Sequence, residues 1–97
     1  MQNKTCLVKT VIRKEIREKD GYHYEYELSV RRSRSVASYN IPLYSLSVKM
    51  KGKETTSAKL CDCFSDESKA MRFFNTLVSA LATPGNLIYV FEDMIDT

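Results

Sequence analysis

Two cysteines stand one residue apart in residues 59–71, KLCDCFSDESKAM, and this spacing raises the question of metal chemistry. Residues i and i+2 of a strand share a face, so the thiols of Cys61 and Cys63 could reach one metal ion. Structural zinc needs four ligands, and the remaining candidates are Cys6 and His23. The chain has no CxxC knuckle and no second cysteine pair. We therefore predict that the cysteines pack as small side chains and hold no metal or other cofactor.

A redox role for the same pair would require a lowered thiol pKa. Cys63 precedes a predicted helix N-terminus, which favours the thiolate. The neighbouring carboxylates of Asp62, Asp66 and Glu67 oppose that effect, because they disfavour a second negative charge. The sequence therefore favours a structural role for this stretch, in which a strand runs into the cap of a helix.

His23 is the single histidine, and Glu25 follows it on the same face of a predicted strand. A histidine beside a carboxylate can perform acid–base work. No serine or cysteine nucleophile is placed beside the pair by the sequence, and the three glycines form no phosphate-binding loop. We predict an exposed cross-strand charge pair, no enzymatic activity and no small-molecule substrate.

The densest positive charge lies in the stretch SVRRSRSVASY, and it could contact phosphate groups. A nucleic-acid surface built on it would use six basic residues: Arg31, Arg32, Arg34, Lys49, Lys51 and Lys53. These two clusters fall at opposite ends of one predicted strand, and the sequence pI of about 8.8 is below the value typical of a dedicated nucleic-acid domain. We favour a solvated hairpin loop over residues 31–34 and keep nucleic-acid binding as the alternative.

Alternation of apolar and polar residues predicts four strands, over residues 5–16, 22–30, 39–50 and 54–64. Asp20-Gly21 and Lys51-Gly52-Lys53 supply hairpin turns. On the first strand Cys6, Val8, Thr10 and Ile12 share one face, while Lys9 and Arg13 share the other. On the other strands the inward residues are Tyr22, Tyr24, Tyr26, Leu28, Val30, Tyr44, Leu46, Val48, Met50, Ala58, Leu60 and Phe64. Pro42 cannot donate to a ladder, so pairing is expected to begin after it or to bulge there.

The apolar period changes to 3.6 after Phe64, which predicts a helix over residues 66–82 with Ser65 as its N-cap. Its apolar stripe consists of Ala70, Phe73, Phe74, Leu77, Val78 and Leu81. Thr83-Pro84 is typical of a second helix start. Residues 86–96 fit either a second helix, with Leu87, Val90, Phe91, Met94 and Ile95 on one side, or a fifth strand.

These elements predict an α+β fold: a four-stranded antiparallel meander with one long C-terminal helix and a second short helix on one face. The length fits a single domain spanning residues 1–97. No apolar run approaches the roughly 20 residues of a membrane span, and the first residues show no signal peptide. Together with three cysteines, an odd number, these features favour the cytoplasm.

Residues 43–50, LYSLSVKM, and residues 58–96 resemble the C-terminal part of a family of uncharacterised small proteins from clostridia and related bacteria. The shared pattern is a proline followed by L-x-x-V-x-E-D-x-I, formed here by Pro84, Leu87, Val90, Glu92, Asp93 and Ile95. The resemblance covers residues 43–97. It implies a helix for the tail and a domain of unknown function, and it supplies no catalytic residues.

The sequence therefore favours a non-enzymatic module that binds another protein or a second copy of itself as a homodimer. The observation behind this expectation is the apolar tail LIYVF, which is larger than a small core needs.

Overall fold

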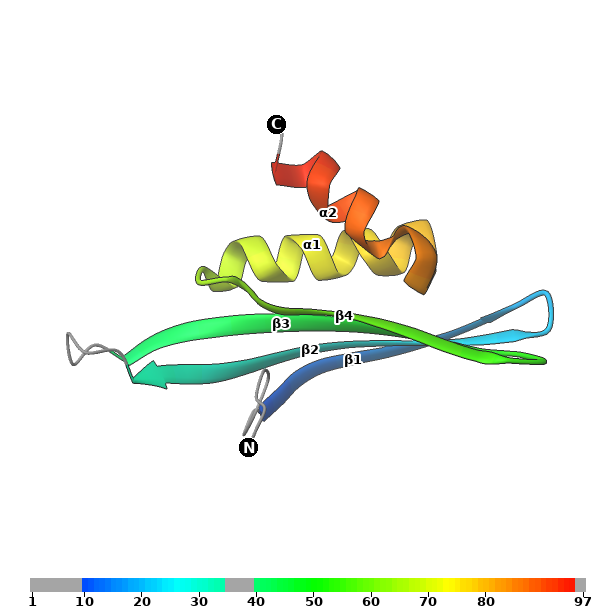
Figure 1. The fold of residues 1–97 in the computed structure, drawn as a ribbon, viewed down its shortest axis with the longest axis horizontal. Helices are drawn as coiled ribbons and strands as arrows, with labels where there is room; N and C mark the ends of the chain where they lie inside the picture. The colour runs from blue at the N-terminus through cyan, green and yellow to red at the C-terminus, as the bar shows by residue number, and fades with distance from the viewer. Residues whose placement is uncertain (1–9, 35–39, 96–97) are drawn as a thin grey trace.

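The computed structural model describes residues 10–34 and 40–95, which form a four-stranded antiparallel sheet and two helices (Figure 1). The strands follow one another as a meander in the order β1-β2-β3-β4. Their bounds are β1 Thr10–Lys19, β2 Tyr22–Arg34, β3 Asn40–Lys51 and β4 Thr55–Phe64. The helices are α1 (Glu67–Ala80) and α2 (Leu87–Ile95), and a single 3₁₀ turn (Pro84–Asn86) precedes α2. The predicted α+β class and antiparallel meander are confirmed.

The lengths of the helices differ from the prediction. The long helix is not the C-terminal one: α1 has 14 residues, and α2, at the C-terminal end, has nine. Helix α1 also starts one residue late, because Asp66 rather than Ser65 is its N-cap and accepts a hydrogen bond from the Lys69 amide. It ends early because Leu81 adopts a left-handed conformation at φ 53°.

A two-residue turn joins β1 to β2 and fixes the register of this first hairpin. Asp20 and Gly21 both have positive φ, 55° and 82°, as a tight hairpin turn requires, so Lys19 pairs directly with Tyr22. Strand β1 therefore reaches Lys19 and does not end at residue 16 as predicted. Residues 5–9 of the predicted strand, with Cys6 and Val8, lie outside the described residues.

The predicted basic loop at residues 31–34 is wrong. These residues continue β2 and pair with β3, from Arg31 opposite Leu43 to Arg34 opposite Asn40. Pairing also passes through Pro42, opposite Arg32, without a bulge, so the predicted interruption there is wrong too. Pro42 fits into this pairing because the pairing of β4 with β3 ends at Tyr44. Beyond that point β3 has β2 as its neighbour, and a proline is tolerated where one side of a strand is unpaired.

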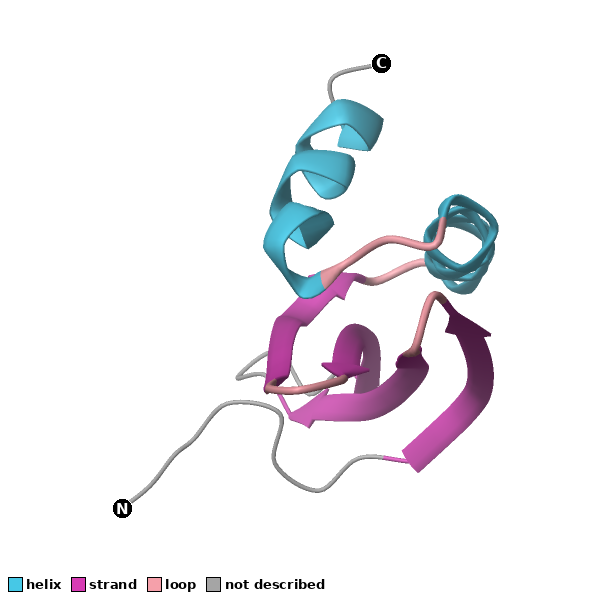
Figure 2. Cartoon of the chain, turned by 90° about the vertical axis from the view of Figure 1, so that its right-hand side faces the viewer, coloured by secondary structure: helices cyan, strands magenta, loops and turns pink. Residues whose placement is uncertain are grey.

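Helix α1 crosses one face of the sheet, here named the covered face, and α2 stands beside α1 and rises away from the sheet (Figures 1 and 2). The covered face and the helices enclose one core, which contains Tyr24, Tyr26, Leu28, Tyr44, Leu46, Val48, Ala70, Phe73, Phe74, Leu77, Ala82 and Leu87. The predicted inward residues Val30, Met50, Ala58, Leu60 and Phe64 pack against it. Tyr22 is the exception, at 40% exposed. It follows the β1–β2 turn, where the sheet extends beyond the helices (Figure 1).

The C-terminal segment, for which the sequence fitted either a second helix or a fifth strand, is a helix. Thr83 and Asn86 form a reciprocal capping box, with the Thr83 amide donating to Asn86 Oδ1 at 2.8 Å, and Pro84 follows the cap as predicted. Leu87 is buried, and Val90 and Phe91 pack against the core. The Phe91 ring lies 5.6 Å from those of Phe64 and Phe73, so α2 is held by contacts with both β4 and α1.

Candidate interaction surface

The CDC stretch is a bulge in β4. Tyr44 pairs with Phe64, but Leu46 pairs with Leu60, so three residues of β4 stand opposite the single residue Ser45. Two extra residues keep Leu60 and Phe64 on the covered face. Asp62 sits at the centre of the bulge with φ 54°, a left-handed conformation that aspartate tolerates better than most residues.

The bulge directs the Asp62 carboxylate onto Arg31 of β2. Arg31 Nε donates to Oδ1 at 3.0 Å and Nη2 donates to Oδ2 at 2.6 Å, which is a bidentate pair. The Asp62 amide donates to the hydroxyl of Ser45 at 2.8 Å. The carboxylate raises the pKa of Arg31 above its ordinary value. Arg31, one of the three arginines of the predicted basic surface, is thus already bound by a carboxylate of the same chain.

The two cysteines of the bulge are in different states. Cys61 is disulfide-bonded. Cys63 is free and packs against the core, with its sulfur 3.5 Å from the carbonyl of Tyr44 and 3.7 Å from that of Leu60. Burial raises the pKa of the Cys63 thiol to about 11, which favours the unreactive thiol. No group of three metal-binding side chains occurs within residues 10–34 and 40–95. Cys6 lies outside the described residues.

His23 belongs to a charge network on the open face, the sheet face opposite the helices. Its Nδ1 is 3.2 Å from Glu18, its Nε2 is 3.2 Å from Glu25, and Lys51 is 3.1 Å from Glu25. The hydrogen bond from Lys51 lowers the pKa of the Glu25 carboxyl, and burial opposes this shift. The predicted His–carboxylate pair is present but half-buried, and Glu18 and Lys51 extend it across three strands.

The basic residues named by the sequence are spread along the sheet. Arg31 pairs with Leu43, and Lys51 pairs with His23, eight residues away along β2. At about 3.3 Å per residue the separation is roughly 26 Å. Lys49 and Lys59 line a shallow depression of about 390 Å³ on the open face, where they alternate with Glu25 and Glu27. The two basic clusters therefore do not merge into one positive patch.

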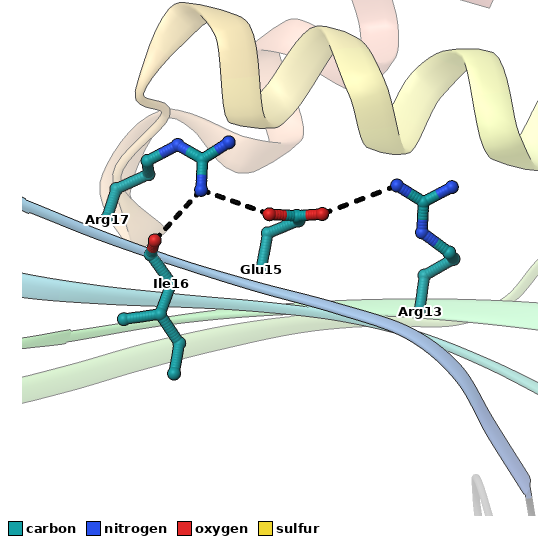
Figure 3. Close-up of polar contacts among 4 residues, drawn as sticks. All are labelled: Arg13, Glu15, Ile16 and Arg17. Atoms are coloured by element: carbon teal, nitrogen blue, oxygen red, sulfur yellow. Dashed lines mark hydrogen bonds and ion pairs between the residues drawn. The ribbon is translucent and has the colours of Figure 1, made fainter.

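Strand β1 carries charge on the face where the other strands carry the core. A bulge at Ile12 shifts the register, so Arg13, Glu15 and Arg17 lie opposite Leu28, Tyr26 and Tyr24. The predicted face partition is therefore wrong, because Thr10 and Arg13 share a face once Ile12 is extra. Glu15 accepts hydrogen bonds from Arg17 at 3.0 Å and from Arg13 at 3.4 Å (Figure 3), and these bonds lower its pKa.

This charged ladder borders α1 and leaves apolar side chains on the other side of β1. The Arg13 guanidinium lies 5.5 Å from the centre of the Phe74 ring, a cation–π contact that covers the edge of the core. Ile16 points the opposite way (Figure 3) and is 46% exposed. Val11 and Ile12 are also exposed. Within the described residues no strand pairs with the outer side of β1.

A second exposed apolar pair lies on α2. Ile88 and Tyr89 face away from the core side of the helix, and Tyr89 is 66% exposed. The apolar tail was predicted from the sequence, whereas the exposed residues of β1 were not. Their signal in the sequence is Ile16, the one uncharged residue in the seven-residue stretch RKEIREK.

The fold and these surfaces define a small α+β protein with exposed apolar side chains on β1 and α2. Residues 7–97 match a family of unknown function, DUF6514, and this chain belongs to it. The match extends well beyond residues 43–97, the range of the resemblance described above. Comparisons with curated proteins and with solved structures found no match.

Neither helix described here has both the length and the apolar character needed to cross a membrane.

Proposed function

We propose that this protein is a non-enzymatic interaction module whose partner is a second copy of the same chain, and that β1 provides the contact surface. The observation that carries this proposal is the edge of β1 that is open within the described residues, where nine of the ten strand residues pair with β2 and Val11, Ile12 and Ile16 are exposed. An unpaired strand edge presents a row of backbone donors and acceptors, which is a template for a further strand.

The absence of catalytic function is part of the same proposal. In residues 10–34 and 40–95, the histidine is engaged by two carboxylates, and Cys63, whose thiol is free, is half-buried against the core. The depression on the open face is lined by side chains of both signs, two carboxylates and two lysines among them. These features support binding through a surface more than chemistry in a pocket. Cytoplasmic location, occurrence in clostridia and the nucleic-acid alternative stay predictions.

Sedimentation velocity over a wide concentration series tests self-association. We expect the mass-average species to move from the 11.2 kDa monomer toward a dimer as concentration rises. A chain that stays monomeric at the highest concentration reached would contradict the proposal.

A further inference from the structure

The regular part of the open edge is the segment Arg13–Lys19, seven residues that follow the bulge at Ile12 and end at the hairpin turn. Its sequence, RKEIREK, has six charged residues and one uncharged residue, Ile16, at its centre. This arrangement limits how the edge can meet a copy of itself.

Symmetry sets the limit. Two antiparallel copies of one strand in a continuous sheet are related by a two-fold axis perpendicular to the sheet, and this axis places one residue opposite its own copy. The axis also keeps each residue on its original face. If it passed through Glu15, Glu15 would face its own copy and Arg13 would face Arg17. Axes through Lys14 or Arg17 likewise set a cation directly against a cation, which is destabilising.

We infer that a second copy adds to the sheet through β1, antiparallel, with the two-fold axis at Ile16. This inference rests on the proposed function and specifies its register. In this register Glu15 faces Arg17 of the second copy on the covered face, and Lys14 faces Glu18 of the second copy on the open face. Both pairs occur twice by symmetry. The outermost pair, Arg13 with Lys19, sets like charges together, and Arg13 is there engaged by Glu15 and the Phe74 ring.

The axial contact joins the two exposed Ile16 side chains on the open face. Because the axis preserves faces, the helices of both copies lie on the same side of the joined sheet. In this register the charges of β1 are complementary to those of its own copy. The axis passes through the exposed Ile16, which is also the centre of the regularly paired segment.

One hydrogen bond of the single chain must be exchanged on pairing. Arg17 Nη1 donates to the Ile16 carbonyl at 2.9 Å (Figure 3), so its guanidinium covers an acceptor of the strand backbone. The same guanidinium binds Glu15 within the strand. In the dimer a backbone amide takes over the carbonyl, and Arg17 moves to Glu15 of the second copy. The association therefore weakens as salt concentration rises.

Charge reversal with mixing tests the register. Glu15→Arg sets two like-charge pairs into the homodimer, and Arg17→Glu does the same with the opposite sign. We expect each variant alone to weaken self-association about tenfold or more, measured by sedimentation or by fluorescence anisotropy of labelled chain. An equimolar mixture of the two variants places opposite charges in both pairs, so we expect it to recover an affinity close to that of the unaltered chain. Circular dichroism of each variant checks that it is folded.

The matched controls are Glu54→Arg in the turn before β4 and Lys59→Glu on β4, which reverse charge away from β1. We expect these variants to associate normally, alone and mixed. If the unaltered chain associates but Glu15→Arg and Arg17→Glu leave it unchanged, or their mixture gains nothing, the register is wrong while self-association stands. If the unaltered chain is monomeric throughout, the proposed function fails first.

A second measurement probes the axis directly. Ile16→Cys places two thiols across the two-fold axis, and we expect mild oxidation to give a covalent dimer linked at this position by peptide mass spectrometry. Tyr89→Cys, on exposed α2, is the matched control and should cross-link much more slowly. Preferential linkage through the α2 position would overturn the assignment to β1.

Discussion

At one edge of the sheet, β4 bulges by two residues before α1 begins, and both helices pack against it through the ring of Phe64. At the other edge, β1 pairs regularly with β2 from Arg13 to Lys19 and meets the helices through the Arg13–Phe74 contact. Strand β4 is thus shielded by an irregular backbone and by aromatic packing, while β1 is shielded by charge.

The two kinds of shielding give the two edges different susceptibility to pairing with another chain. Burial at β4 is non-directional and contributes in proportion to the apolar area removed from water, so it resists exchange with another chain. The charged side chains of β1 disfavour pairing with most other strands, but they permit pairing with a strand whose charges are complementary in order. If packing holds β4 and charge shields β1, substitutions in the packed side should lower stability, and substitutions on β1 should change association.

Removing the aromatic packing beside β4 should cost the most. Phe73 is fully buried, and its ring centre lies 5.5 Å from that of Phe64 and 5.6 Å from that of Phe91. Phe73→Ala should lower the free energy of unfolding by about 3–5 kcal/mol, because it removes buried area and leaves a cavity. Urea denaturation followed by circular dichroism measures this loss.

The matched control is Tyr89→Ala on α2, a large side chain that is 66% exposed. We expect it to change the free energy of unfolding by less than about 0.5 kcal/mol. Equal costs for the two variants would mean that the aromatic cluster does not hold α2 and β4 together.

The covered side of the fold was largely predictable from the sequence because its signals are local. Period-two tyrosines placed Tyr24 and Tyr26 inside, and the 3.6-residue stripe placed Phe73, Phe74 and Leu77 against them. These patterns follow from the geometry of strands and helices, whatever their partners.

The two edges were not predictable in the same way. A bulge depends on which residues face each other across strands. The sequence therefore carries no periodic signal for the extra residue Ile12 or for the left-handed conformation of Asp62. Arg31 looked like part of a loop because its neighbours in sequence are basic. Its carboxylate partner is 31 residues away, and only the folded register brings the two together.

The next largest effect is expected at alkaline pH, which should lower the free energy of unfolding through Tyr26 on the covered face. The Tyr26 hydroxyl donates to the Ala82 carbonyl at 2.8 Å, and burial raises the pKa of Tyr26 to about 12. The unfolded chain loses this proton near pH 10, the ordinary value. The stabilisation is therefore complete below pH 10 and is lost as pH rises toward 12, by about 2 kcal/mol.

Tyr26→Phe should flatten this part of the stability–pH curve, and Tyr89→Phe should leave it as it is. The Cys63 thiol, whose pKa is raised to about 11, contributes a separate decline that starts near pH 9 and survives in both variants. Urea midpoints measured from pH 8 to 12 give the comparison. A Tyr26→Phe curve that falls as steeply as that of the unaltered chain would contradict the assignment.

The bulge of β4 should show a smaller and more specific effect. Asp62→Ala removes the bidentate pair with Arg31 and keeps a Cβ at φ 54° without a polar side chain that can bond locally. Asp62→Gly removes the same pair but suits the left-handed backbone. We expect Asp62→Ala to lower the free energy of unfolding by about 2 kcal/mol and Asp62→Gly by about 1 kcal/mol less than that. Asp20→Ala, at φ 55° in the first turn, isolates the backbone contribution. If alanine and glycine cost the same at residue 62, the conformation of the bulge contributes nothing.

The smallest effect on folding is expected at the open edge, where monomer stability and self-association can be measured separately. Ile16 is 46% exposed, so Ile16→Thr, which keeps the branched Cβ that suits a strand, should change the free energy of unfolding of the monomer by less than about 0.5 kcal/mol. The same substitution removes apolar contact at the proposed two-fold axis and should weaken self-association. Urea denaturation at low concentration and sedimentation at high concentration separate the two quantities. A large loss of monomer stability would show that Ile16 is a structural residue of the single chain, and β1 would then be an edge of the same kind as β4.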